Sequence, residues 1–171
     1  MKKHKKMIFL SLLVALGLVL GLFESMIPLP IAFPGARLGL SNIVVLVTLT
    51  VFGYKDGLIV AVLKTVLLML VTGSVSSFFF SFAGAMLSAV SMILADRFLK
   101  KYLTLIGISE IGSFFHNFGQ VLVASLVLQN KMIFTYLPFL LLLGLFTGFF
   151  VGLASIYIVN NLKINFREVM K

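Results

Sequence analysis

Residues 1–23 read MKKHKKMIFLSLLVALGLVLGLF. Four lysines precede an apolar run that extends without interruption from Met7 to Phe23. A basic start followed by an apolar run is also how a secretory signal peptide begins. This run is long, however, and no convincing small-x-small cleavage site follows it. We therefore expect it to be a retained first membrane helix.

The apolar character of this first stretch continues through the whole chain of 171 residues. Hydrophobic residues make up 61% of the chain and charged residues 11%, and the mean hydropathy is +1.18. These values lie far outside the range of ordinary soluble domains. Because one membrane-spanning helix takes about 20 apolar residues, the chain has room for roughly six. The composition predicts an all-α integral membrane protein with one transmembrane domain over residues 1–171.

Turn-forming residues divide the chain into six apolar segments. These segments cover about residues 7–23, 38–53, 57–72, 78–98, 110–128 and 134–160. Pro28, Pro30 and Pro34 are incompatible with regular helix and predict an ordered loop after the first segment. The sequence GYKDG at 53–57 predicts a tight turn. Pro138 is expected in the first turns of the sixth helix, where the missing N–H costs little.

The basic residues give an orientation for these six helices. Of the 14 lysines and arginines, only Arg37 and Lys131 fall on the side opposite the N-terminus, and Lys64 falls within a span. Short loops rich in Lys and Arg stay preferentially in the cytoplasm. We therefore expect both termini to be cytoplasmic, in a bacterial cytoplasmic membrane. The net charge of +9 comes from basic residues at the ends of the apolar segments, where they set the membrane orientation. It therefore does not indicate a nucleic-acid partner.

Several classes of chemistry are excluded or disfavoured by the residues present. The chain has no cysteine, which excludes disulfides, thiolate metal sites and cysteine nucleophiles. It has no GxGxxG or Walker pattern and no DDxxD-like acidic motif, so any ATP dependence must come from another subunit. Its five acidic residues are scattered, and His4 and His116 are far apart in the expected topology. We expect no enzyme activity, no metal and no cofactor.

Small residues recur on two of the expected helices. They are Gly144, Gly148 and Gly152 in the sixth segment, and Ser77, Ser81, Gly84, Ser88 and Ser91 in the fourth. Such faces let helices approach closely in lipid. The glycines are expected to serve packing, either within one chain or between two. The serines could serve packing or hold a ligand.

The fifth segment contains the stretch EIGSFFHNFGQVL at 110–122. Helical spacing puts four of its polar residues, Glu110, Ser113, Asn117 and Gln120, on one stripe that continues to Ala124. His116 lies at the margin of this stripe. Amides left unpaired in hydrocarbon cost several kcal/mol, so the stripe must contact other side chains, water or a ligand. An interhelical hydrogen-bond seam is one interpretation. A ligand-facing surface is the one favoured here.

Lys64 lies near the middle of the apolar stretch GLIVAVLKTVLLMLV at 57–71. A charge at this depth is costly enough to count as a functional candidate. Its expected counter-charge is Glu110 or a substrate anion, and a structural Lys–Glu pair is the alternative.

Arg37 and Asn42 stand at the expected outer start of the second helix, where helix N–H groups favour an anion. Glu24, at the end of the first helix, could pair with Arg37. The alternative is that Glu24 and Arg37 are simple anchors at the membrane boundary. The three prolines between them are expected to stiffen a cap over whatever lies beneath.

Three segments resemble a known bacterial family: ESMIPLP…PGARLGLSN at 24–42, GSVSSFFFSFAGAMLS at 73–88 and HNFGQ at 116–120. They are similar to the family described both as heptaprenyl diphosphate synthase component I and as Gx transporter. The first name implies a helper subunit of long-chain prenyl diphosphate formation for menaquinone. The second implies transport of a solute.

The size, the six-helix plan and the stiff first loop are similar to the substrate-binding S component of energy-coupling factor transporters. That resemblance implies that small residues of the first helix contact the coupling subunit, and Ala15, Gly17 and Gly21 could supply such a surface. It also implies a substrate site near the outer side, among the later helices and the first loop.

Together these observations predict a membrane protein that binds a small organic solute and works with an energising coupling subunit and ATPases. The expected site residues are Arg37, Asn42, Lys64, Asn117 and Gln120, with Glu110 and His116 as supporting or proton-linked groups. The basic residues favour an anionic solute, and the phenylalanines of FFFSF and SFFHNF favour an aromatic or isoprenoid body. One alternative is an accessory subunit in prenyl diphosphate or menaquinone metabolism, or in flavin- or quinone-linked electron transfer. A purely structural anchor is another.

Overall fold

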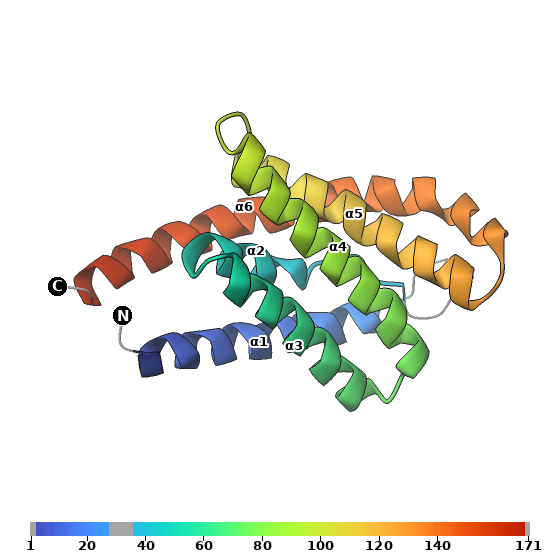
Figure 1. Cartoon of the computed structure of the whole chain (residues 1–171), viewed down its shortest axis with the longest axis horizontal. Helices are drawn as coiled ribbons and strands as arrows, with labels where there is room; N and C mark the ends of the chain where they lie inside the picture. The colour runs from blue at the N-terminus through green and yellow to red at the C-terminus, as the bar shows by residue number, and fades with distance from the viewer. Residues whose placement is uncertain (1–2, 28–35, 170–171) are drawn as a thin grey trace.

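The computed structural model describes residues 3–27 and 36–169, with side chains placed as far as residue 163. The described residues form six α-helices and one short 3-10 helix (Figure 1). They are α1 (Lys3–Ser25), α2 (Asn42–Val51), α3 (Tyr54–Thr72), α4 (Val75–Leu99), α5 (Leu105–Val127), η1 (Lys131–Tyr136) and α6 (Leu137–Val169). The predicted all-α fold with six helices is confirmed.

The helices form one bundle in which α5 packs between α4 and α6, and α3 contacts α1, α2 and α4. The start of α1 and the end of α6 lie at the same end of this bundle (Figure 1). We call it the terminal end, and the opposite one the far end. A chain that crosses a membrane an even number of times has both of its ends on the same side, which agrees with this arrangement.

Three helical stretches among the described residues are long and apolar enough to cross a membrane: His4–Ser25, Val75–Leu99 and Lys131–Lys163. Large apolar side chains cover their outer surfaces, as Leu12, Leu94 and Phe146 illustrate. Exposed apolar surface of this extent is unusual for a soluble monomer. The chain is therefore a multi-pass membrane protein.

The second helix differs from its prediction. It was expected over 38–53, but α2 has only 10 residues and begins at Asn42. Gly39 has a φ of 86°, a left-handed conformation that ends any helical path there. At 1.5 Å per residue, α2 is about 15 Å long, half a bilayer core. It is buried among the other helices, and a non-helical segment, residues 36–41, leads into it.

Most other helix boundaries lie within a few residues of the positions that the turn-forming residues predict. A tight turn was predicted at residues 53–57, but it is confined to Phe52 and Gly53, because Gly53 has a φ of 105° and α3 already begins at Tyr54. Pro138 lies in the first turn of α6, as predicted. The fifth helix was expected from residue 110 but begins at Leu105, with Thr104 before it in extended conformation. The predicted loop carrying Pro28, Pro30 and Pro34 lies outside the described residues.

The glycines of α6 pack within the chain. A Cβ at Gly144 would lie 2.5 Å from Asn117 Nδ2, and a Cβ at Gly152 would lie 2.5 Å from the backbone of Ile106. Both contacts are with α5, so this face serves packing inside one chain. The serine face of α4 is turned inward as well, with Ser81, Ser88 and Ser91 buried.

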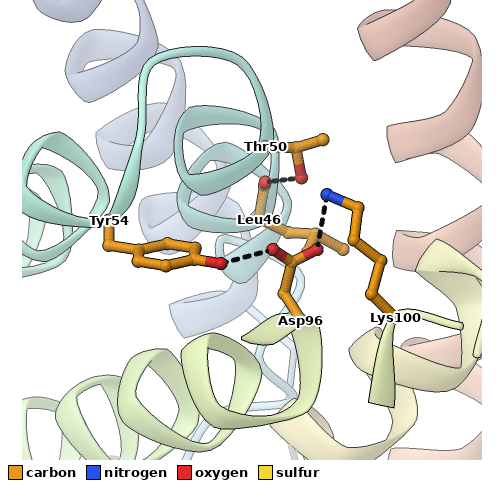
Figure 2. Close-up of polar contacts among 5 residues, drawn as sticks. All are labelled: Leu46, Thr50, Tyr54, Asp96 and Lys100. Carbon is orange, nitrogen blue, oxygen red and sulfur yellow. Dashed lines mark hydrogen bonds and ion pairs between the residues drawn. The ribbon is translucent and has the colours of Figure 1, made fainter. Parts of the chain in front are cut away.

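Polar contacts tie the helices together at the terminal end (Figure 2). The Tyr54 hydroxyl donates to Asp96 Oδ2 at 2.7 Å, and Lys100 Nζ lies 3.5 Å from Asp96 Oδ1. A further ion pair, of 2.6 Å, joins Lys6 of α1 to Asp56 of α3. These contacts link α1, α3 and α4 where the expected cytoplasmic surface begins.

Candidate functional site

Several backbone groups of the non-helical segment 36–41 form hydrogen bonds with side chains from other parts of the bundle. Gln120 Oε1 accepts from the Arg37 N–H at 2.8 Å, and Gln120 Nε2 donates to the Arg37 carbonyl at 2.9 Å. Thr147 Oγ1 donates to the Leu38 carbonyl at 3.1 Å. The Leu40 N–H donates to Glu24 Oε1. Irregular backbone inside a membrane protein requires partners of this kind.

The rest of the α5 stripe is also paired. Ser113 Oγ donates to the Gly144 carbonyl at 2.8 Å, and Asn117 Nδ2 donates to the Leu140 carbonyl at 3.0 Å. Together with Gln120, these side chains join α5 to α6 and to the segment 36–41. We call Ser113, Asn117 and Gln120 the polar seam. Each of its members has a protein partner, as in the hydrogen-bond-seam interpretation of the sequence.

A second group of polar residues is also buried, and most of its members are charged. Glu24, Arg37, Lys64 and His116 are exposed by only 2, 5, 3 and 2% of their surfaces. Burial is expensive for such groups unless they are paired. We call these four residues the charged cluster. It combines two cations and one carboxylate, and it gathers residues from α1, α3, α5 and the segment before α2.

Lys64 is held in place by the start of α2. Its Nζ donates to Ser41 Oγ and to Asn42 Oδ1, both at 2.9 Å. Glu24 is the acidic group that acts electrostatically on Lys64, and it acts on Arg37 as well. The three charges form no direct ion pair with one another. The predicted association of Glu24 with Arg37 is thus electrostatic rather than a contact.

The charged cluster keeps several hydrogen-bonding atoms unused. Arg37 Nε and Nη1, Glu24 Oε2 and both ring nitrogens of His116 are buried without a hydrogen-bond partner among the described residues. Buried polar atoms are satisfied in the great majority of cases. Unused donors beside two cations therefore indicate that a ligand, water or another group completes this site.

Glycines make room for the basic side chains. A Cβ at Gly17 would lie 3.5 Å from Lys64 Cδ, and a Cβ at Gly21 would lie 3.6 Å from Arg37 Nη1. These two glycines of α1 were expected to contact a coupling subunit. They face inward instead, because the long side chains of Lys64 and Arg37 need that space. Ala15 remains on the exposed side of α1.

The His116 ring lies between two further glycines. A Cβ at Gly84 would lie 2.9 Å from His116 Nδ1, and a Cβ at Gly39 would lie 3.0 Å from His116 Cδ2. Any larger residue at these positions would displace the ring. The ring is thus fixed beside Lys64 and Arg37, both of which act on it electrostatically.

Glu110 does not join the charged cluster. Its Oε2 would lie 2.8 Å from a Cβ on Gly148, and the side chain lines an apolar groove between α5 and α6. Glu24, not Glu110, is the carboxylate near Lys64, which corrects the expectation that Glu110 is the counter-charge. The reason is depth: Glu110 lies in the second turn of α5, near the terminal end, whereas Asn117 and Gln120 lie two to three turns further on.

A small cavity lies beside the cluster. Its volume is about 10 Å³, and polar side chains from four helices line it, among them Asn42, Ser88 and Thr147. The Ser88 hydroxyl is fully buried and has no partner among the described residues. A space of this size holds one water molecule. Within the described residues, no group of three His, Cys, Asp or Glu side chains could hold a metal ion.

Sequence reasoning found most of these residues but not all of their roles. Arg37, Asn42, Lys64 and His116 are brought together as expected, whereas Asn117 and Gln120 bond to neighbouring backbone. Glu24 was expected only as a partner of Arg37, and Ser41 was missed. The signal for Ser41 was its position next to Asn42, one residue before a helix that the sequence placed too early.

Comparison with known proteins identifies the family. The family model for heptaprenyl diphosphate synthase component I matches residues 13–158, which include every residue of the charged cluster and the polar seam. No curated protein matches the chain, and no solved structure matches it. The chain belongs to the heptaprenyl diphosphate synthase component I family.

Proposed function

We propose that this protein is a membrane subunit that binds a small anionic organic solute in the charged cluster. In this role it resembles the S component of an energy-coupling factor transporter, without catalytic activity of its own. Arg37, Lys64 and His116 bind the solute, and Asn42 and Glu24 position Lys64. Asn117 and Gln120 act indirectly, because they hold the segment that carries Arg37.

The observation that carries this proposal is the state of the Arg37 side chain. The guanidinium is almost completely buried, yet its Nε and Nη1 have no hydrogen-bond partner among the described residues. A guanidinium presents its donors in a planar fork that matches a carboxylate or phosphate. Lys64 adds a second positive charge beside it. An anionic head group would bind to both the Arg37 guanidinium and the Lys64 ammonium.

The proposal includes an orientation and partners. Six crossings with both termini in the cytoplasm of a bacterium would put the charged cluster in the outer half of the membrane, where a solute can enter from outside. The chain has no nucleotide-binding motif, so a coupling subunit and ATPases would supply the energy. A reporter fused between α3 and α4, after Thr72, should be active only outside the cytoplasm. Cytoplasmic activity there would contradict this orientation.

Mass spectrometry of the purified protein tests the proposed ligand class. We expect an anionic small molecule to co-purify with the unmodified protein and to be lost from the variant Arg37→Met. A hydrogen bond to a charged group is worth about 1.5–3 kcal/mol, so occupancy should fall by roughly 10- to 100-fold. Lys131→Met is the matched control, because Lys131 is exposed and lies at the far end, outside the cluster. Equal recovery from Arg37→Met and Lys131→Met would contradict the proposal.

The family description favours a second candidate function. As a component of prenyl diphosphate synthesis, the chain would be a non-catalytic accessory subunit in menaquinone metabolism or in quinone- or flavin-linked electron transfer. The same two cations would then receive the head group of a polyprenyl compound. A polyprenyl lipid in the mass spectrum would support this function, and a water-soluble, vitamin-like anion would support transport. A protein that binds nothing would match the structural-anchor alternative.

A further inference from the structure

Two apolar grooves of similar size flank α5 on the outer surface of the bundle. One has a volume of about 480 Å³ and lies between α5 and α6, where Phe114, Leu141, Leu142 and Leu145 line it. The other has a volume of about 520 Å³ and lies between α4 and α5, where Leu94 is part of its lining. Both are open to the surroundings. In a membrane protein, such grooves accommodate lipid chains.

One difference separates the two grooves. Glu110 lines the α5/α6 groove, whereas the lining of the α4/α5 groove contains no charged residue. Glu110 is half-buried and makes no hydrogen bond or ion pair with any described residue. A carboxyl at the edge of the hydrocarbon region is costly without a partner. A cationic group from outside the described fold would offset this cost.

The position of Glu110 limits what this partner can be. Glu110 is the sixth residue of α5, so it lies about 7.5 Å along the helix from Leu105. The loop before α5 carries the exposed residues Lys100 and Lys101, which are suited to the lipid head-group region. A phospholipid whose acyl chain lies in the groove would thus have its head group within reach of Glu110.

We propose that the α5/α6 groove is a binding site for an aminophospholipid. The primary ammonium of an ethanolamine head group donates a hydrogen bond to the Glu110 carboxylate, and an acyl chain lies along Phe114, Leu141 and Leu145. Charge complementarity favours an ammonium over an anionic head group. A primary ammonium also has N–H donors, which the quaternary ammonium of choline lacks. The site does not depend on the proposed solute-binding function.

Tryptophan fluorescence provides a direct test, because the chain contains no tryptophan. The variant Leu142→Trp puts a reporter in the α5/α6 groove, and Leu94→Trp puts one in the α4/α5 groove. Each is reconstituted into phosphatidylcholine vesicles that contain an equal mole fraction of dibrominated phosphatidylethanolamine, phosphatidylcholine or phosphatidylglycerol. Bromine quenches a tryptophan that it contacts.

We expect dibrominated phosphatidylethanolamine to quench the Leu142→Trp reporter more strongly than the other two lipids do. A local enrichment of roughly threefold corresponds to about 0.7 kcal/mol, within the range of a partly exposed ion pair. The three lipids should quench the Leu94→Trp reporter equally. Adding Glu110→Gln to Leu142→Trp should abolish the preference. Because Glu110 has no protein partner to lose, this change should leave the fold intact, which circular dichroism checks.

Three outcomes would overturn the proposal. Equal quenching of Leu142→Trp by all three lipids would show that Glu110 selects no amine, as expected if a partner subunit normally covers the groove. A preference for phosphatidylethanolamine that persists after Glu110→Gln would show that a group other than Glu110 selects this lipid. A preference of equal size at Leu94→Trp would show general enrichment around the protein.

Discussion

The polar seam and the charged cluster lie in the same interior, but they differ in how far their polar atoms are satisfied. In the seam, Ser113, Asn117 and Gln120 each bond to backbone carbonyls or N–H groups at 2.8–3.0 Å. In the cluster, Arg37 Nε and Nη1 have no partner within residues 3–27 and 36–163, and the backbone of Gly84 gives the His116 ring at most a weak hydrogen bond. Satisfied groups of this kind hold a structure together, and unsatisfied ones are where a ligand can add binding energy. The predictions below separate these two roles.

The largest effect is expected at Lys64. In Lys64→Met, Glu24 loses the main positive charge that acts on it, and a buried charge left without compensation costs about 3–5 kcal/mol. The double variant Lys64→Met with Glu24→Gln should be more stable than Lys64→Met alone, because the buried carboxylate that lost Lys64 is then neutral. Unfolding of the purified proteins in detergent measures both. A double variant less stable than the single one would show that Glu24 and Lys64 do not compensate each other.

A smaller loss is expected at Gln120. Gln120→Leu keeps a side chain of similar size but leaves the Arg37 N–H and carbonyl unpaired in the interior. Each unsatisfied group costs about 1–3 kcal/mol, so for these two groups we expect a loss of about 2–6 kcal/mol in the free energy of unfolding. A Gln120→Leu variant as stable as the unmodified protein would contradict the proposed role of the seam.

The contrast between Gln120 and Lys64 also shows what the sequence could predict. The six helices follow from apolar runs and from breakers such as Gly53, which act locally. The start of α2 could not be predicted, because residues 38–41 are mostly apolar and only the left-handed conformation of Gly39 ends the helix there. The sequence indicated that the polar residues of α5 need partners. It could not show that those partners are backbone atoms of a segment 83 positions away.

The choice of acidic partner for Lys64 was beyond sequence reasoning for a similar reason. The sequence is compatible with either Glu24 or Glu110 as the acidic partner of Lys64. Only the packing of α1 against α3 decides between them. That packing depends on Gly17 and Gly21, whose missing side chains leave space for Lys64 and Arg37. A glycine in an apolar run shows that space is available but not which residue uses it.

An intermediate effect is expected when a side chain at position 21 fills the space beside Arg37. Gly21→Leu would force bulk against Leu68 and the Arg37 guanidinium, since even a Cβ there would lie 2.6 Å from Leu68 Cδ2. Overpacking typically costs about 1–3 kcal/mol, and ligand recovery should fall with it. Ala15→Leu, on the exposed side of α1, is the matched control and should change neither quantity. Ligand recovery unaffected by Gly21→Leu would argue that the solute does not contact Arg37.

The smallest effect is expected at Ser113, which contributes one hydrogen bond to α6. Ser113→Ala should lower the free energy of unfolding by about 1 kcal/mol, the usual net value of one such bond. Ligand recovery should not change, because Ser113 belongs to the seam. If Ser113→Ala lost the ligand but kept its stability, Ser113 would belong to the binding site and not to the polar seam.

Arg37 is where the difference between the two regions can be tested most directly. The decisive measurement is the stability of Arg37→Met in the absence of ligand, together with the amount of small molecule that co-purifies with it. Because Nε and Nη1 of the guanidinium have no partner among the described residues, its removal should leave the ligand-free protein as stable as before, or more stable, while the bound anion is lost. A strongly destabilised Arg37→Met that still carries its ligand would show that the charged cluster is structural.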